Sequence, residues 1–107
     1  MSEGKPLVSQ AFQTFLAEAP EQAKAWGALV QSLGQASALD AKTGALAYLA
    51  VLAALERPSG IPFHVQAAKQ AGASREEVIS AILVGLPAAG HVVTQTLPPA
   101  VAAYDEA

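Results

Sequence analysis

The sequence contains no cysteine, and this absence excludes disulfides, thiolate zinc sites and any cysteine nucleophile. Charged residues are also scarce, at 14% against a typical ~25%. Six basic and nine acidic side chains give a net charge of −3 with no basic cluster, so we expect no nucleic-acid partner. Hydrophobic residues make up 52% of the chain, which excludes a disordered protein.

Long apolar runs are missing as well. The longest, Ala45 to Leu55, has eleven residues, whereas a helix that spans a bilayer needs ~20. The start of the chain lacks the apolar stretch of a signal peptide, and we expect residues 1–5 to be a frayed end. The length of 107 residues fits one domain. We therefore predict a single cytoplasmic domain over residues 1–107, with no membrane partner.

The residues that are abundant favour helices. Alanine occurs 25 times, and it has the highest helix propensity because it loses no side-chain entropy. Spacing and helix breakers predict an all-α fold, a compact bundle of about six helices: from Leu7 to before Pro20, from about Pro20 to Gly34, from Asp40 to about Glu56, from Ser59 to Gly72, from Ser74 to Leu86, and from about Ala88 to Tyr104. The last helix is expected to bend near Pro98 and Pro99, and to expose residues 94–96 to solvent.

Several helix ends carry recognisable signals. Ser59 is predicted to cap the fourth helix, which places Pro62 at the third helical position, where its missing N–H is not needed. Gly72 is predicted to end that helix as the residue after the cap. Ser74 and Glu77 match a capping box, in which each side chain accepts a hydrogen bond from the other residue's backbone.

The third helix is apolar on every side from Ala45 to Leu55, after Asp40 as its expected N-cap. A helix of this kind is buried all round, and so small a domain has few elements that can surround it. We therefore expect another subunit to supply part of its surroundings.

Three motifs follow one another in the middle of the chain: Leu39-Asp40-Ala41-Lys42-Thr43 before the apolar helix, His64-Val65-Gln66-Ala67-Ala68 after it, and then Ala71-Gly72-Ala73-Ser74-Arg75-Glu76-Glu77-Val78. In order and spacing this block, Leu39 to Gly90, resembles the carboxymuconolactone decarboxylase and alkylhydroperoxidase D superfamily over about half of the chain. The resemblance implies an alkylhydroperoxidase D-like helical subunit that assembles into homotrimers or homohexamers, in agreement with the apolar third helix.

The superfamily has two branches. The alkylhydroperoxidase branch uses a Glu, a C-x-x-C pair and a His, which the resemblance places at Ala45, at Arg57 and Gly60, and at His64. Only His64 is kept, and a thiol peroxidase needs one thiolate to attack peroxide and a second thiol to resolve the sulfenic acid. We therefore expect no thiol peroxidase activity. The decarboxylase branch lacks the cysteine pair and acts on a cyclic, carboxylate-rich lactone from aromatic degradation, and this sequence is similar to it in that respect.

The candidate site lies around the junction of the third and fourth helices. His64 is the candidate catalytic residue, as a proton shuttle or anion ligand, because imidazole titrates near neutral pH. Arg57, with the Ser59 hydroxyl and the free N–H groups expected near Gly60, would bind an organic carboxylate. Tyr48 could hydrogen-bond a ligand in a pocket.

Each candidate also has a plain structural interpretation. His64 could be a partly buried histidine that is hydrogen-bonded to backbone, Arg57 a solvated loop residue, and Tyr48 a core residue with its hydroxyl at the rim. His91 follows no family motif, and we interpret it as a core or interface histidine.

No metal or cofactor is expected. His64 and His91 have no cysteine or well-spaced carboxylate beside them, and so fall short of three or four ligands, although a three-fold assembly could still bring copies of one histidine together. The leading hypothesis is a carboxymuconolactone decarboxylase-like, cofactor-free lyase or binder that acts on a small carboxylated organic acid. The alternative is a non-catalytic helical assembly protein that kept the fold and lost the thiols.

Overall fold

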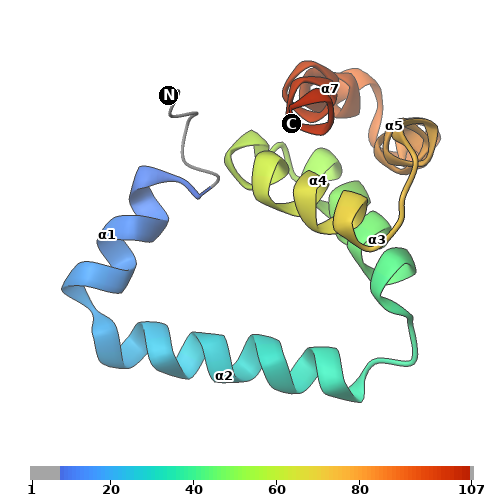
Figure 1. Ribbon diagram of the computed structural model, residues 1–107. Coiled ribbons are helices and arrows are strands. Elements are labelled where there is room, and N and C mark those ends of the chain that lie inside the picture. The colour runs from blue at the N-terminus through green and yellow to red at the C-terminus, as the bar shows by residue number, and fades with distance from the viewer. Residues whose placement is uncertain (1–7, 107) are drawn as a thin grey trace. The chain divides into compact units, whose positions relative to one another are not determined.

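The computed structural model describes residues 8–106, and every regular element within them is helical (Figure 1). The α-helices are α1 (Gln10–Glu18), α2 (Pro20–Ala36), α3 (Ala41–Ala54), α4 (Ile61–Gln70), α5 (Arg75–Leu83), α6 (Leu86–Ala89) and α7 (Leu97–Asp105), with 3₁₀ segments η1 (Pro58–Gly60) and η2 (His91–Thr96). The predicted all-α fold class is therefore confirmed. The expectation for residues 1–5 lies outside the described residues.

The chain divides into two compact units, residues 1–40 and 41–107. The described part of the first unit consists of α1 and α2, and aromatic rings hold these two helices together. The Trp26 ring centroid lies 5.4 Å from that of Phe12 and 6.4 Å from that of Phe15, both in edge-on geometry. Ala23 is the one buried residue among those described in this unit, so α1 and α2 enclose very little core.

The second unit contains a continuous hydrophobic core. Its central helix, α3, packs against α4, α5 and η2, and α7 packs against α4 and α5. The buried apolar residues come from all of these elements: Leu49, Leu52, Ala53, Ile61, Val65, Ala68, Ala73, Val78, Ile82, Val93, Ala100 and Ala103. The second unit therefore has the core that the first unit lacks.

Helix α3 is apolar all round, but the other elements of the second unit do not cover every side of it. Leu49 and Ala53 are 0% exposed, whereas Tyr48 is 45%, Val51 50% and Leu55 59% exposed. These last three residues follow the i, i+3, i+7 spacing of one helical face. We call Tyr48, Val51 and Leu55 the α3 strip.

The turn between α4 and α5 follows the predicted pattern. Gly72 has φ +101, and the Ala73 N–H donates to the Ala68 carbonyl at 2.9 Å, which is a Schellman ending of α4. The Ser74 Oγ then accepts from the Glu77 N–H at 3.0 Å, and the Glu77 carboxylate accepts from the Ser74 N–H at 2.9 Å. The predicted roles of Gly72 and of the capping box are both confirmed.

The end of α3 has the same Schellman geometry with a different residue in the left-handed position. The Arg57 N–H donates to the Leu52 carbonyl at 2.9 Å, and the Glu56 N–H donates to the Ala53 carbonyl at 3.2 Å. Glu56 has φ +57, and it is the one described residue other than glycine with a positive φ. A side chain in this region costs free energy that glycine would avoid.

The prediction that Ser59 caps the fourth helix is wrong. Ser59 lies inside η1, and the N-cap of α4 is Gly60, with no side-chain hydrogen bond at the cap. Pro58 begins this 3₁₀ turn, in which the Gly60 N–H donates to the Arg57 carbonyl and the Ile61 N–H to the Pro58 carbonyl. The backbone thus satisfies donors that a serine cap would otherwise have served.

The prediction of one last helix from about Ala88 to Tyr104, bent near Pro98 and Pro99, is also wrong. The chain breaks at Gly90, which has φ +87, whereas Pro98 and Pro99 lie in the first turn of α7. Proline fits there because the first N–H groups of a helix have no intrahelical partner. Thr96, which was expected at the surface, is 1% exposed, and its hydroxyl donates to the Val93 carbonyl at 2.8 Å.

Candidate functional site

Two of the predicted site residues lie ring against ring where α3 packs on α4. The ring centroids of Tyr48 and His64 are 4.3 Å apart, with an interplanar angle of 45°. Phe63 stands edge-on to the same imidazole at 5.1 Å. Tyr48 comes from the α3 strip and His64 from the first turn of α4, so the contact between the two helices sets the position of both rings.

The imidazole of His64 is half-buried, and desolvation by this burial lowers its pKa below the usual value. The ring is therefore mostly neutral at pH 7 and can accept a proton. Among residues 8–106, no group hydrogen-bonds the His64 side chain, so no described backbone group holds the imidazole.

Gly60 brings the backbone close to this histidine. A Cβ at Gly60 would lie 3.3 Å from Cδ1 of Leu52 and 3.9 Å from Cδ2 of His64. Contacts of 3.3 Å are tighter than ordinary van der Waals contacts, so the absence of a side chain lets η1 pack against α3 beside the imidazole. Tyr48, Gly60 and His64 thus form the part of the predicted site that the structure brings together.

The side chains of Arg57 and Ser59 are not part of this group, although the Arg57 carbonyl accepts from the Gly60 N–H. Both are exposed, and neither side chain makes a hydrogen bond or ion pair within residues 8–106. The set of free N–H groups expected at the start of α4 is also smaller than predicted, because η1 uses the N–H groups of Gly60 and Ile61. The Arg57 guanidinium remains a solvated positive charge seven positions before His64.

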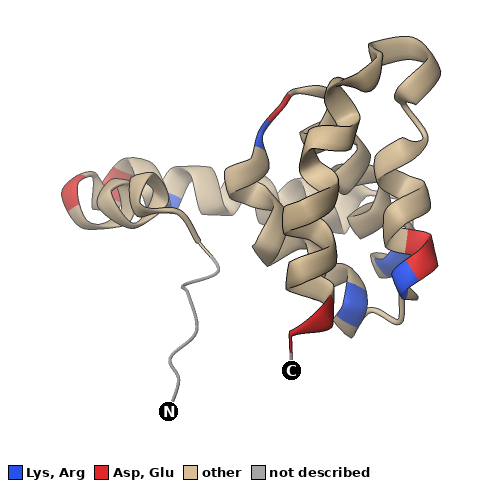
Figure 2. Ribbon diagram, turned by 90° about the horizontal axis from the view of Figure 1, so that it is seen from above, with Lys and Arg blue, Asp and Glu red and all other residues tan. Residues whose placement is uncertain are grey.

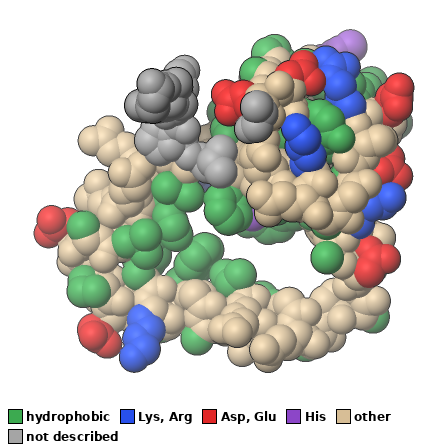
Figure 3. Space-filling model, in the orientation of Figure 1, with side chains coloured by type: hydrophobic (Ala, Val, Ile, Leu, Met, Phe, Trp, Pro, Cys, Tyr) green, Lys and Arg blue, Asp and Glu red, His purple; other side chains and the backbone are tan. Residues whose placement is uncertain are grey.

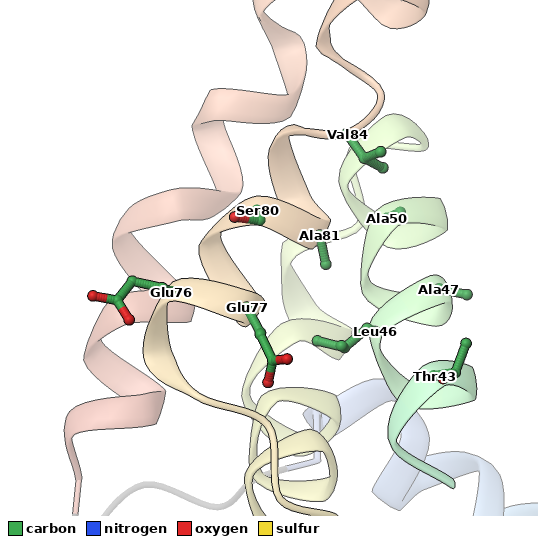
Figure 4. Close-up of a pocket in the computed structure, with 9 residues that line it drawn as sticks. All are labelled: Thr43, Leu46, Ala47, Ala50, Glu76, Glu77, Ser80, Ala81 and Val84. Carbon is green, nitrogen blue, oxygen red and sulfur yellow. The ribbon is translucent and has the colours of Figure 1, made fainter. Parts of the chain in front are cut away.

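An open groove of about 500 Å³ lies elsewhere in the second unit, between α3 and α5 (Figure 4). Its lining is mainly apolar and consists of Thr43, Leu46, Ala47, Ala50, Glu76, Glu77, Ser80, Ala81 and Val84. Figure 4 shows Leu46, Glu77 and Ala81 pointing into the space between the helices, whereas Glu76 points away. None of the predicted site residues lines this groove. The feature of the sequence that could have indicated this groove is the short side chains of Ala47 and Ala50 on α3, which do not fill the space between α3 and α5.

The carboxylate at this groove is already engaged. Glu77 accepts from the Ser74 backbone, and its other oxygen lies 3.0 Å from the Lys42 Nζ. The hydrogen bond from Ser74 and then the one from Lys42 lower the pKa of Glu77, so the group stays ionised. Charged residues are few along the rest of the ribbon (Figure 2). Glu77 therefore takes part in the cap of α5 and in the ion pair with Lys42, and as an ionised carboxylate it has no proton to donate.

No metal site or membrane span is found in the described part of the chain. His91 lies exposed in η2, and residues 8–106 contain no group of three His, Cys, Asp or Glu side chains that could hold a metal ion. Within the same residues, each helix is too short or too polar to reach across a bilayer.

Comparison with known proteins identifies the family. The family model of the carboxymuconolactone decarboxylases matches residues 20–102, which is more than half of the chain and includes His64 and the apolar α3. No curated protein and no solved structure matches the sequence. With the helical fold and the motif order described above, the chain belongs to the carboxymuconolactone decarboxylase family.

Proposed function

We propose that this protein is a cofactor-free lyase or binder of the decarboxylase type that acts on a small carboxylated organic acid. The observation that carries the proposal is the Tyr48–His64 ring pair, with centroids 4.3 Å apart. Tyr48 is 45% exposed, so a ligand can reach the pair from solvent. An imidazole that is mostly neutral at pH 7 then lies beside a phenol that can donate a hydrogen bond.

Each residue has a chemical role in this proposal. In a decarboxylation, the electron pair of the breaking carbon–carbon bond stays on the substrate carbon, which then takes up a proton. His64 can pass that proton from water, because its imidazole gains and loses protons near neutral pH. Arg57 would hold a substrate carboxylate through a charge-assisted hydrogen bond, since no described residue pairs with it.

Calorimetry and turnover assays with small dicarboxylates and lactones test the proposal. A charge-assisted hydrogen bond contributes about 1.5–3 kcal/mol, so Arg57→Ala should weaken carboxylate binding roughly ten- to a hundred-fold. His64→Ala should reduce turnover more than binding, because it removes a proton carrier. Lys24→Ala and His91→Ala are matched controls, since both side chains are exposed and lie outside the site.

Two results would reject this site. One is a wild-type protein that binds none of the carboxylates tested. The other is an Arg57→Ala variant that binds a carboxylate as tightly as the wild type does. In either case Arg57 and His64 would have only structural roles.

A non-catalytic assembly protein is the second candidate, and one observation favours it. The groove between α3 and α5 is lined mainly by apolar side chains and does not include His64, so this groove lacks the convergent polar groups of an active site. This candidate predicts no turnover with any lactone or dicarboxylate, together with an unchanged assembly in His64→Ala.

Assembly into a homotrimer or homohexamer is part of both candidates. It is supported by the α3 strip, where three large apolar side chains are about half exposed on the central helix of the second unit. Light scattering at low micromolar concentration should show three or six chains, and a folded monomer would contradict this. We also propose a cytoplasmic location.

A further inference from the structure

The position of the His64 imidazole follows that of the helix that carries it. No described residue hydrogen-bonds the ring, whose centroid lies 4.3 Å from that of Tyr48 and 5.1 Å from that of Phe63. His64 lies in the first turn of α4, and the N-cap of this helix makes no side-chain hydrogen bond. The contact between the imidazole and Tyr48 therefore depends on how α4 is rotated about its own axis.

The hydrophobic core contacts α4 along one stripe. Ile61, Val65 and Ala68 are 0% exposed, and they follow the i, i+4, i+7 spacing of one helical face. The last of the three has a single methyl group, so the apolar contact is smallest toward the C-terminal end of α4. Contacts of another kind hold this end of the helix.

These contacts join α4 to the C-terminal end of α7, against which it packs. The Gln66 Nε2 donates to the Ala103 carbonyl at 2.6 Å. The Lys69 Nζ donates to the Tyr104 carbonyl at 2.7 Å and lies 4.7 Å from the centroid of the Tyr104 ring. It also donates to the Glu106 carbonyl at 3.2 Å. The last carbonyls of a helix have no intrahelical partner, so side chains of a neighbouring helix can bind them. We call Gln66 and Lys69 the α4 donor pair.

The α4 donor pair and His64 lie on opposite flanks of the buried stripe. At 100° per residue, Gln66 and Lys69 are about 60° apart, so both can reach the same partner helix. His64 lies about 140–160° from either of them. One flank of α4 therefore contacts α7 and the other contacts Tyr48 on α3. Any rotation of α4 moves both flanks by the same angle.

A small rotation is enough to matter. Side chains end about 5–6 Å from the helix axis, so a rotation of about 10° moves the imidazole by roughly 1 Å. A displacement of this size at a reacting group can lower turnover about a hundred-fold. Along the hydrogen bond from Gln66, which is 2.6 Å long, the same displacement would exceed hydrogen-bonding distance. The α4 donor pair thus resists the rotations that would disturb the imidazole.

We propose that Gln66 and Lys69 are positioning residues, which bind the end of α7, fix the rotation of α4 and so hold the His64 ring against Tyr48. They act through α4, from the flank opposite to the imidazole. Their effect on turnover rests on the proposed function of His64 as a proton carrier, whereas their effect on the ring does not. The C-terminal end of α7, about 40 residues after His64, thereby becomes part of the candidate site.

Proton NMR of the imidazoles at pH 8, where His64 is neutral, tests the effect on the ring. The Hδ2 and Hε1 signals of His64 are displaced by the ring currents of Tyr48 and Phe63. In Gln66→Leu/Lys69→Met these signals should move toward those of His91, which is exposed. The His91 signals should stay in place.

The control breaks another contact at the same end of α7. Figure 3 shows basic and acidic side chains gathered over α7 and the elements next to it, so the control must remove a charged contact that leaves α4 alone. Arg75, the first residue of α5, pairs with Asp105 at 2.9 Å. Arg75→Gln should therefore leave the His64 signals unchanged. Lys69→Arg keeps a charged donor and should also keep them.

Turnover of small dicarboxylates and lactones gives the second readout. Gln66→Leu/Lys69→Met should lower kcat roughly ten- to a hundred-fold with little change in KM, because the imidazole is displaced while the rest of the site stays. If the wild type converts none of these compounds, the proposed function fails, and the NMR signals still decide on the positioning role.

Two NMR results would overturn the positioning role. One is a folded double variant whose His64 signals match those of the wild type. The other is an Arg75→Gln variant that moves the His64 signals as far as the double variant does. Far-ultraviolet circular dichroism shows whether each variant keeps its helices. If the double variant does not, Gln66→Leu and Lys69→Met are measured singly against the same two criteria.

Discussion

The imidazole of His64 lies against the phenol ring of Tyr48, with 4.3 Å between ring centroids and no hydrogen bond to hold it from any described residue. Its position thus depends on packing between α3 and α4. A histidine held in this way keeps both ring nitrogens available to a ligand. This is the property that separates it from histidines that are fixed by backbone carbonyls.

The burial of His64 makes stability depend on pH in a defined direction. Its folded pKa is lowered, so the unfolded chain takes up the proton first as the pH falls below the usual value of 6.5. The free energy of unfolding should therefore fall from pH 7.5 to pH 5.5, and His64→Gln should flatten this slope. Urea unfolding at the two pH values measures the effect. The control is His91→Gln, which replaces the other histidine of the chain at an exposed position in η2. An identical slope in His64→Gln would contradict the prediction.

Substitutions at the two Schellman endings should change the stability of the protein in opposite directions. Gly72→Ala should destabilise the protein by about 1–2 kcal/mol, because alanine is strained at φ +101 even though its Cβ meets nothing within 4 Å. Glu56→Gly should stabilise it by up to about 1 kcal/mol, since glycine adopts the positive φ of this position without strain. The thermal unfolding of both variants, compared with that of the wild type, tests this prediction. The prediction would fail if Glu56→Gly melted below the wild type.

The two serines near helix starts should differ in their effect. Ser74→Ala removes the side-chain acceptor of the capping box and should cost about 1 kcal/mol of stability. Ser59→Ala should change stability by less than about 0.5 kcal/mol, because Ser59 is exposed and caps no helix. Chemical denaturation of the pair checks both values, and equal losses would show that Ser59 has a capping role after all.

Thiol-dependent peroxidase activity should be absent. With no cysteine in the sequence, no sulfenic acid can form and no second thiol can resolve it. Purified protein supplied with an organic hydroperoxide and a dithiol donor should therefore match the uncatalysed rate. The assay includes a chelator, because bound trace metal can also consume peroxide. Turnover that persists with the chelator would contradict the prediction.

Much of the second unit could be predicted because its signals are local. The capping box at Ser74 and the glycine at position 72 act within a few residues, and the structure shows both as predicted. The errors come from residues with two permitted roles. Pro98 can bend a helix or begin one, and here Gly90 breaks the chain so that Pro98 lies in a first turn. Ser59 was predicted as a cap, but Pro58 turns the backbone into a 3₁₀ segment before it can act.

The sequence indicated which residues belong to the candidate site, but it did not predict how they are arranged in space. His64 was indicated by its place in the family motif, and Tyr48 by being the polar residue of an apolar helix. Their ring contact depends on how α3 packs on α4, which no local pattern encodes. The groove between α3 and α5 was missed for a related reason. Alanine at positions 47 and 50 predicts a helix, but it does not show where two helices leave space between them.

The C-terminal end of α7 is joined to the turn between α4 and α5 by three side chains. The Tyr104 hydroxyl donates to the Ala73 carbonyl at 2.8 Å, Lys69 donates to the Tyr104 carbonyl at 2.7 Å, and Arg75 pairs with Asp105 at 2.9 Å. Because these interactions connect the turn to α7, the turn can open only when α7 also moves. Its amide protons should therefore exchange with deuterium as slowly as those inside α7, although Gly72 itself is exposed to solvent.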